Sequence, residues 1–392
     1  MSNKVEKSGL VSKLRFPEFR DSGAWGSMFG DDLFDQISNK DHNSDLPVLA
    51  ITQEQGAIPR NMIDYHVSVT EKSIESYKVV EVGDFIISLR SFQGGIEYSS
   101  YKGICSPAYV ILRLKAECSA DYFKHFLKTS RFIALLTKNL EGLRDGKMVS
   151  YKQFSELQLP TPSLNEQQKI ADCLTSLDEL LALEAQKLDT LKTHKKGLMQ
   201  QLFPAEGETL PKLRFSEFRG AGEWEIKSFD EMFSIGNGKD YKHLQSGAIP
   251  VYGSGGYMLS VNDYLHDGDS VCIGRKGTIN NPFFLTGKFW TVDTLFYTYS
   301  FKGCLPRFVY CIFQKINWLK HNEAGGVPSL SKTNISKIKT AVPKLAEQQK
   351  IADCIVSIDE LIALEAEKID ALKAYKEGMM QHLFPSLEEV TA

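Results

Sequence analysis

The sequence lacks several features that would place it in a simple class. It has no run of about 18 apolar residues, so we expect no membrane-spanning helix. Its N-terminus, MSNKVEKSGL, is polar and lacks the apolar segment of a signal peptide, which favours a cytoplasmic protein. Its seven cysteines include no C-x-x-C pair, so reduced and mostly buried thiols are favoured over a disulfide framework. Its eight histidines are scattered without paired spacing, and we expect no metal site.

Motifs of a self-sufficient enzyme are also missing. Residues 281–284 read NPFF, which is similar to the N-P-P-[FY] motif of amino-methyltransferases but lacks the second proline. No G-x-G loop for S-adenosylmethionine accompanies it. Residues 236–239 read GNGK and lack the spacing of a phosphate-binding loop. We therefore expect no catalytic centre and no bound cofactor in this chain, and a methyltransferase or nuclease acting alone is disfavoured.

A strong excess of charge of one sign is absent. The formal net charge is −3. Residues 1–164 hold 20 basic and 20 acidic side chains, and residues 205–345 hold 17 and 13. Neither region has the basic excess of a DNA-binding protein that works alone. If DNA is the ligand, we expect partner proteins to neutralise part of the phosphate charge.

The sequence does contain a long internal repeat. Residues 167–204 and 348–385 align without a gap, and 26 of the 38 positions are identical. Apolar residues recur in alternate steps of four and three, which is the heptad pattern of a coiled coil. The predicted seam consists of Ile170, Leu174, Leu177, Leu181, Leu188, Leu191, Ile351, Ile355, Ile358, Ile362, Ile369 and Leu372.

Each copy of the repeat is predicted to form one long helix. Ser163 and Glu166 have the spacing of a capping box, and Pro204 and Pro385 end the two helices. About 37 residues at ~1.5 Å each give a rod of roughly 55 Å. Two separate amphipathic helices, each packed on its own domain, are the alternative. The narrow seam, with polar breaks at the same places in both copies, favours each copy as the partner of the other. The order of domains and helices favours an antiparallel pair, because parallel helices would need a long return connection.

A second repeat lies outside the helices and defines the domain plan. Residues 14–25 read LRFPEFRDSGAW, and residues 213–224 read LRFSEFRGAGEW. A pseudo-two-fold arrangement places the first of these segments near the C-terminal end of the second helix. The predicted boundaries are a first domain at 1–164, a helix at 165–204, a second domain at 205–345, a helix at 346–386 and a flexible tail at 387–392.

The two inter-helix regions are divergent but related. A Gly-Asp pair at 83–84 and at 268–269 opens an apolar strand, and an arginine follows seven residues after each glycine. A glycine-containing turn, a second strand and a helix come next in both. The predicted helices span 121–137 and 306–320. Short β runs followed by a helix predict an α+β domain, with α/β as the alternative.

These motifs together resemble the specificity subunit of type I restriction-modification systems. The resemblance covers nearly the whole chain. It rests on the repeated EQQKIADCL…LDELLALEAQK helix, on LRFPEFR…W, on DFIISLRSFQGGIEY with SPAYVILRL, and on YGSGGY…GRKGTINNPFF with FWTVDTLFY. It implies two target-recognition domains, each of which reads one half of a bipartite, asymmetric DNA site, and helices that act as a spacer between the halves.

The resemblance also implies partners. The helices would dock two modification subunits, which methylate adenine with S-adenosylmethionine. Two restriction subunits, which are motor nucleases using ATP and magnesium, would complete a system for defence against phage. The chain itself would carry no catalytic centre.

Candidate DNA contacts lie in loops where Arg, Lys, Asn, Gln, Ser or Tyr stands beside glycine, which suits phosphate and base-edge contacts. A structural turn with an Arg–carboxylate pair, a plain hairpin or a solvated loop remains open as the alternative at each of them. The predicted contacts are Arg90, Ser91, Gln93, Gly94, Gly95, Arg144, Lys147, Lys152, Lys239, Tyr241, Lys242, Ser254, Gly255, Gly256, Arg275, Lys276, Asn280, Asn281 and Lys332.

A second hypothesis fits the same repeats. The chain would be a coiled-coil scaffold that assembles enzyme subunits, and its globular domains would bind protein instead of DNA. The near-neutral charge of both domains keeps this hypothesis open.

Overall fold

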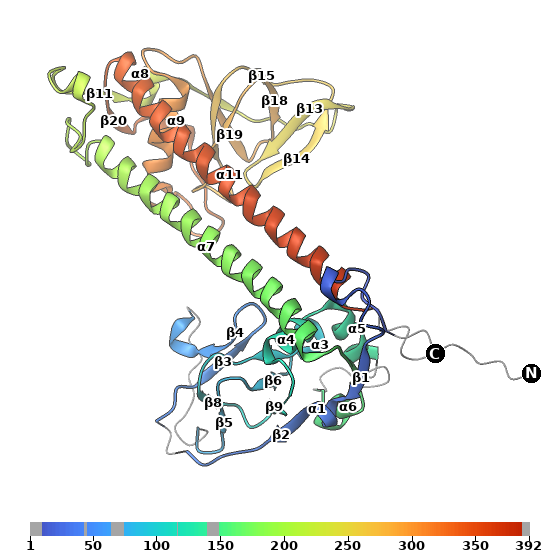
Figure 1. Ribbon diagram of the computed structural model, residues 1–392. Helices are drawn as coiled ribbons and strands as arrows, with labels where there is room; N and C mark the ends of the chain where they lie inside the picture. The colour runs from blue at the N-terminus through green and yellow to red at the C-terminus, as the bar shows by residue number, and fades with distance from the viewer. Residues whose placement is uncertain (1–9, 43–44, 64–73, 116, 139–148, 386–392) are drawn as a thin grey trace, which may run out of the picture. The chain divides into compact units, whose positions relative to one another are not determined.

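A computed structural model describes residues 10–42, 45–63, 74–115, 117–138 and 149–385 (Figure 1). Packing divides the chain into two compact units. Unit 1 comprises Met1–Glu184 with Lys368–Ala392, and unit 2 comprises Ala185–Glu367. Each unit therefore contains one globular domain, the first half of one long helix and the second half of the other. The predicted domain boundaries, which follow the sequence repeat, stay a prediction.

Two uninterrupted helices, α7 (Leu164–Leu202) and α11 (Leu345–Leu383), confirm the predicted long helices. In unit 1, Asp178 of α7 pairs with Lys376 of α11, and Glu184 pairs with Lys368. Residue numbers thus rise along one helix as they fall along the other. The helices run antiparallel in this unit, as predicted.

Unit 2 repeats the arrangement with the roles of the helices exchanged. Lys195 of α7 pairs with Asp359 of α11 at 2.6 Å, and Lys187 pairs with Glu365 at 2.5 Å. The polar residues that interrupt the heptad pattern, Glu184 and Lys195 with their repeats, are therefore members of ion pairs between the helices. A polar residue at a seam position fixes the register of a coiled coil, because any shift would leave it beside apolar groups.

Every predicted seam residue is buried or half-buried. Ile170 and Leu174, at the start of α7, belong to the hydrophobic core of unit 1. Ile351 and Ile355, at the start of α11, belong to the core of unit 2. The first turns of each predicted seam therefore pack into a globular domain as well as along the partner helix.

The domain of unit 1 is an α+β structure around a four-stranded antiparallel sheet. Its strands lie in the order β2 (Phe34–Ile37), β9 (Val110–Leu114), β6 (Phe85–Ile87) and β7 (Glu97–Tyr98). The smaller pairs are β1 (Gly26–Phe29) with β10 (Gln158–Thr161), β3 (Leu49–Thr52) with β4 (Gly56–Pro59), and β5 (Lys78–Val80) with β8 (Gly103–Cys105). The helices are α1 (Gly30–Leu33), α3 (Ser91–Gly94), α4 (Ala120–Phe126), α5 (Ser130–Lys138) and α6 (Tyr151–Ser155).

The domain of unit 2 has the same sheet order. Its strands are β12 (Ser234–Asn237), β19 (Leu295–Tyr299), β16 (Ser270–Gly274) and β17 (Phe283–Leu285). A second sheet contains β14 (Gly256–Val261), β13 (Ser246–Gly253), β18 (Lys288–Thr291) and β15 (His266–Asp267), and β11 (Glu225–Ser228) pairs with β20 (Lys339–Val342). The helices are α8 (Phe229–Met232), α9 (Pro306–Lys315) and α10 (Lys332–Ser336).

The helix predicted at 121–137 is two helices. The first, α4, ends at Phe126, and Thr129 starts the second by accepting a hydrogen bond from the Phe132 N–H at 3.2 Å through its hydroxyl oxygen. Thr129 has the preferred chemistry of an N-cap, which explains the break. The helix predicted at 306–320 ends at Lys315 as α9, and a 3₁₀ turn follows at Trp318–His321.

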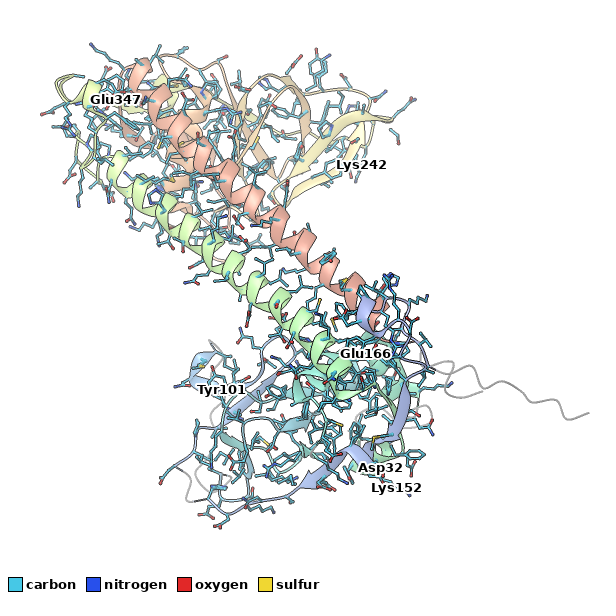
Figure 2. All side chains as sticks on the ribbon, viewed as in Figure 1. Asp32, Tyr101, Lys152, Glu166, Lys242 and Glu347 are labelled. Carbon is cyan, nitrogen blue, oxygen red and sulfur yellow. The ribbon has the colours of Figure 1, made fainter. Side chains whose placement is uncertain are left out.

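The repeated LRF segment attaches the helix ends to each other. In unit 1, Arg15 donates two hydrogen bonds to the Glu166 carboxylate, at 2.6 and 2.7 Å, and Trp25 Nε1 donates a third at 3.1 Å. The Leu14 N–H donates to the His382 carbonyl at 2.9 Å. One segment thus contacts the start of α7 and the end of α11, as the pseudo-two-fold expectation required. Figure 2 labels Glu166 at the start of its helix.

The predicted capping box forms only in part. The Glu166 N–H donates to Ser163 Oγ at 3.4 Å, but the Glu166 carboxylate accepts from Arg15 and Trp25 instead of turning back to the cap. Unit 2 repeats the contact: Arg214 donates to both oxygens of Glu347 at 2.7 Å. A tertiary ion pair thus takes the place of the local hydrogen bond at the start of α7, and the same kind of ion pair forms at the start of α11.

His125 on α4 is buried against the start of α7. Its Nε2 lies 3.1 Å from Thr175 Oγ1, and its Nδ1 lies 3.8 Å from Asp178 Oδ2. Burial, together with the nearby positive charge of Lys376, lowers the pKa of His125 from 6.5 to about 4, while Asp178 opposes the shift. The folded protein therefore favours the neutral imidazole.

We expect Glu166→Ala to lower the free energy of unfolding of unit 1 by about 3–5 kcal/mol, because it leaves the buried charge of Arg15 unpaired. Urea unfolding would measure the loss. The matched control is Glu18→Ala in the same segment, which removes an exposed pair with Lys169 and should cost less than about 1 kcal/mol. Equal losses for the two variants would contradict this account of the ion pair.

We expect acid to destabilise unit 1 through His125. A pKa that is lowered on folding gives stability that is present above pH 6.5 and is lost as the pH falls through about 4. The loss is at most about 3 kcal/mol. Thermal unfolding of the wild type and of His125→Gln, measured between pH 7 and pH 4, should show a flatter profile for the variant. Parallel profiles would rule out the histidine as the cause.

Candidate nucleic-acid interface

Two of the predicted contact segments of unit 2 meet at residues 291–295, between β18 and β19. The Lys239 N–H donates to the Thr291 carbonyl at 2.8 Å. The Arg275 N–H donates to the Thr294 carbonyl at 2.8 Å, and its guanidinium donates to the Asp293 carbonyl at 3.4 Å. Loops that are distant in the sequence are therefore held by the same short backbone segment.

A hairpin turn and a third loop join this group. Ser254 and Gly255 form the turn between β13 and β14, and a Cβ on Gly277 would lie 3.3 Å from Ser254 Oγ. The Leu330 N–H donates to the Arg275 carbonyl at 2.9 Å. Lys332 begins α10 two residues later. The structure thus brings the loops that carry the predicted contacts of unit 2 into one neighbourhood.

Most of the predicted side chains in this neighbourhood are exposed. Tyr241 is half-buried and packs on the apolar cluster of Val251 and Trp290, so it supports the loop that carries its neighbours. Gly256 has φ +109°, a conformation that favours glycine, and it fixes the turn. The exposed residues are Lys239, Lys242, Gly255, Arg275, Lys276, Asn280, Asn281 and Lys332, while Ser254 is half-buried; Figure 2 labels Lys242.

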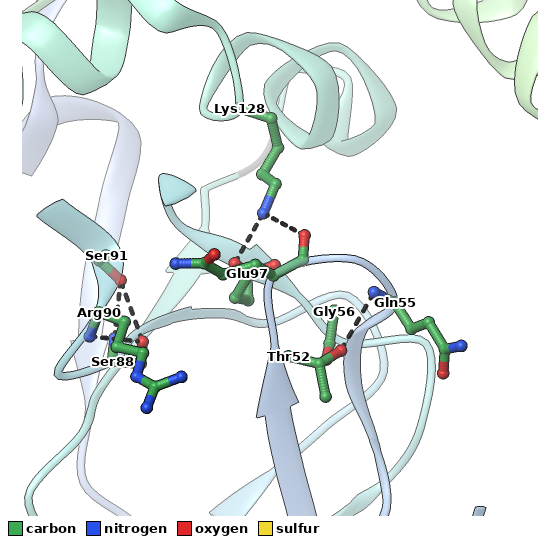
Figure 3. Close-up of polar contacts among 9 residues, drawn as sticks. Thr52, Gln55, Gly56, Ser88, Arg90, Ser91, Glu97 and Lys128 are labelled. Atoms are coloured by element: carbon green, nitrogen blue, oxygen red, sulfur yellow. Dashed lines mark hydrogen bonds and ion pairs between the residues drawn. The ribbon is translucent and has the colours of Figure 1, made fainter. Parts of the chain in front are cut away.

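In unit 1 the predicted contacts divide into exposed and buried residues. Arg90 and Gln93 are exposed. Ser91 is buried, and its Oγ accepts a hydrogen bond from the Ser88 N–H at 2.8 Å (Figure 3). Gly95 has φ +82°, and a Cβ there would lie 2.2 Å from the Leu127 carbonyl oxygen. Ser91 and Gly95 therefore shape the turn that presents Arg90.

The remaining predictions in unit 1 have separate positions. Lys152 is exposed on the short helix α6. Gly94 faces the hairpin turn after β3, where an added Cβ would lie 2.7 Å from the side chain of Gln53. Arg144 and Lys147 lie outside the described residues. DNA contact by all these residues stays a prediction.

Sequence reasoning missed the turn between β3 and β4 in unit 1. Thr52 Oγ1 donates to the Gly56 carbonyl at 3.0 Å and accepts from the Gln55 N–H at 3.1 Å (Figure 3). Between this turn and Arg90 lies an open cavity of about 390 Å³. The signal in the sequence was the polar run TQEQG between two apolar runs. This run forms the hairpin turn that corresponds to the turn of Ser254 and Gly255 in unit 2.

Lys128 links this turn to the wall of the cavity. Its Nζ donates to Glu97 Oε1 at 2.6 Å and to the Gln53 carbonyl at 3.0 Å (Figure 3). Burial raises the pKa of Glu97, and the hydrogen bond from Lys128 opposes that rise. The buried carboxylate is therefore neutralised locally, so it adds little negative charge to a surface where a polyanion would approach.

Among the described residues, no cluster of His, Cys, Asp and Glu is arranged to hold a metal ion. The same part of the chain has no helix long and apolar enough to cross a membrane.

Comparison with known proteins gives consistent matches. The model of the family described as "Type I restriction modification DNA specificity domain" matches residues 32–193 and 221–374. The type I restriction enzyme MjaVIII specificity subunit of Methanocaldococcus jannaschii is 24% identical over 368 residues, with 81% of each chain covered.

Two solved structures show a similar fold. The type I restriction-modification S subunit from M. genitalium has a TM-score of 0.61 and 18% identity, and the match covers 96% of this chain and 99% of that one. A chain from a structural study of complex assembly and conformational transition of the type I R-M system has a TM-score of 0.57 and 14% identity, over 92% and 97% of the chains.

We expect Gly95→Ala to destabilise unit 1 by about 1–3 kcal/mol, because a side chain at positive φ is strained and its Cβ would collide with the Leu127 carbonyl. The measurement is the midpoint of thermal unfolding. Gly255→Ala is the control: its Cβ would meet nothing within 4 Å, and the change should stay within about 0.5 kcal/mol. A harmless Gly95→Ala would show that this glycine is not needed for the turn.

Proposed function

We infer the function of this chain from its family, because the chain belongs to the type I restriction modification DNA specificity domain family. It is a specificity subunit with two target-recognition domains, and recognition of DNA sequence is the standard role of this family. We propose that each unit reads one half of a bipartite, asymmetric DNA target. The chain itself would work without a catalytic centre.

The observation that carries this proposal is a shared frame with different side chains. The order of strands in the four-stranded sheet is equivalent in both units. In unit 1, Gln53 in the turn after β3 lies against Gly94, which follows β6. In unit 2, Ser254 in the turn after β13 lies against Gly277, which follows β16. The side chains around these turns differ between the units. Equivalent surfaces with unlike side chains suit two unlike half-sites, so the target would not be a palindrome.

Exposed leucines support α7 and α11 as docking surfaces for partner subunits. Leu180 and Leu183 on α7 and their repeats Leu361 and Leu364 on α11 lie outside the predicted seam and face solvent. We propose that two modification subunits, which carry S-adenosylmethionine, dock on these helices. Two restriction subunits with ATP and magnesium would complete a cytoplasmic complex on double-stranded DNA, and the helices would set the gap between the half-sites.

The proposal predicts a modular methylation pattern. We expect cells that express the chain with its modification subunit to carry methylated adenine in a single motif with two unlike halves and a constant gap. Replacing residues 26–164 by those of another family member should change one half and leave the other intact. The donor should keep aromatic residues at the positions of Tyr122 and Phe126, because both contact Phe384, the residue after α11.

Methylated-adenine mapping of total DNA reads both halves and the gap at once. A change in both halves, or in neither, would contradict the modular assignment. A complex that assembles normally but leaves no motif would favour the scaffold hypothesis, in which the globular domains bind protein.

A further inference from the structure

The turn between β3 and β4 of unit 1 has an ordered backbone and exposed side chains. The Thr52 hydroxyl donates to the Gly56 carbonyl and accepts from the Gln55 N–H. The Lys128 ammonium donates to the Gln53 carbonyl. Gly56 has φ +72° and lies against the Tyr98 carbonyl, where a Cβ would approach to 2.6 Å. The side chains of Gln53, Glu54 and Gln55 are exposed at the tip.

Arg90 lies on the other side of the cavity and is also placed on a fixed backbone. Its N–H donates to Ser88 Oγ at 3.2 Å, and its carbonyl accepts from the N–H groups of Gln93 and Gly94 at 2.9 and 3.2 Å. Its guanidinium remains exposed. Two elements distant in the sequence thus present amide and guanidinium groups to one open cavity.

The charge of this cavity suits base edges better than phosphates. Glu54 is an exposed carboxylate at the tip, and a phosphate placed there would be repelled. Among the described residues that line the cavity, Arg90 is the only one with a positive charge. Lys128 stands nearby, but its charge is paired with that of Glu97. Phosphates are attracted most strongly by Lys and Arg, whereas bases are read by hydrogen bonds of defined geometry.

Given the proposed DNA-recognition function, on which this step depends, we propose that Gln53, Gln55 and Arg90 form one element that reads purine edges in the major groove. Glutamine binds the N6 and N7 atoms of adenine through two hydrogen bonds, and arginine binds O6 and N7 of guanine in the same way. A two-stranded β-ribbon fits the major groove. Because the backbone is already ordered, the element loses little conformational freedom on binding.

The corresponding turn of unit 2 cannot act in this way. It carries Ser254 and Gly255 in place of the long side chains, although its contact with Gly277 matches that of Gln53 with Gly94. Base readout by this turn is therefore a property of the half-site that unit 1 binds, and in unit 2 readout falls to other residues, such as Arg275 and Asn280.

The test uses the full chain in complex with its modification subunit and compares methylated-adenine maps. In the double variant Gln53→Ala/Gln55→Ala, and separately in Arg90→Ala, we expect roughly tenfold to hundredfold less discrimination at one or two positions of one half-site. Both variants should affect the same half. The other half-site and the gap should remain as in the wild type.

Gly94→Ala provides a second, independent variant. Its Cβ would lie 2.7 Å from both Cγ and Cδ of Gln53, so this exposed side chain must move although the glutamine itself is retained. We expect weaker discrimination at the position affected by the double variant, with thermal stability close to that of the wild type. The control Glu18→Ala, which removes an exposed ion pair with Lys169 and is no predicted DNA contact, should leave both halves of the motif unchanged.

The outcomes separate this proposal from the one it rests on. A wild-type motif with two halves, together with an unchanged motif in the double variant, overturns purine readout by the turn and leaves the proposed function standing. Binding of Arg90→Ala that weakens equally for all sequences, with a salt dependence reduced by one phosphate contact, also overturns it, because that result marks a backbone contact. Absence of any motif with the wild-type complex overturns both proposals.

Discussion

The buried pair between Arg15 and Glu166, repeated as Arg214 and Glu347, is the constraint on which the rest of each unit depends. A buried charge is tolerated only when it is paired and hydrogen-bonded, so the segment before each domain cannot separate from the start of its helix. In unit 1 the neighbouring Leu14 N–H binds the end of α11. Two helix ends and one domain core thereby become a single packing unit.

Polar residues in the seam add a second constraint. A heptad of apolar residues alone would allow two helices to slide or to reverse, because each apolar rung resembles the next. Glu184 pairs with Lys368 in unit 1, and Lys195 pairs with Asp359 in unit 2. Each pair is satisfied in one register and one orientation. The interruptions of the pattern therefore determine how the helices align, while the apolar positions supply the burial.

The sequence predicted the features that depend on repetition and periodicity. The helices, their antiparallel direction and the approach of Leu14 to the end of α11 follow from repeats whose physical meaning is local. Other features depend on contacts between segments far apart. The Glu166 carboxylate has two possible partners in sequence terms, and only the fold brings Arg15 close enough to take it. The burial of Ser91 and the position of the turn after Thr52 have the same origin, because both depend on how separate loops pack.

The two domains show how a fold can keep its frame and still present different side chains. Gly95 belongs to the frame, because a Cβ there would collide with backbone that cannot move away. Gln53 and Gln55 belong to the exposed tip, where a substitution removes no buried contact and changes stability by about 0.5 kcal/mol or less. Side chains at the tip can therefore vary while the core and the helix attachments stay constant. Separation of this kind allows the ligand preference of one unit to change without loss of folding, because the residues that order the turn are different from the residues that the turn presents.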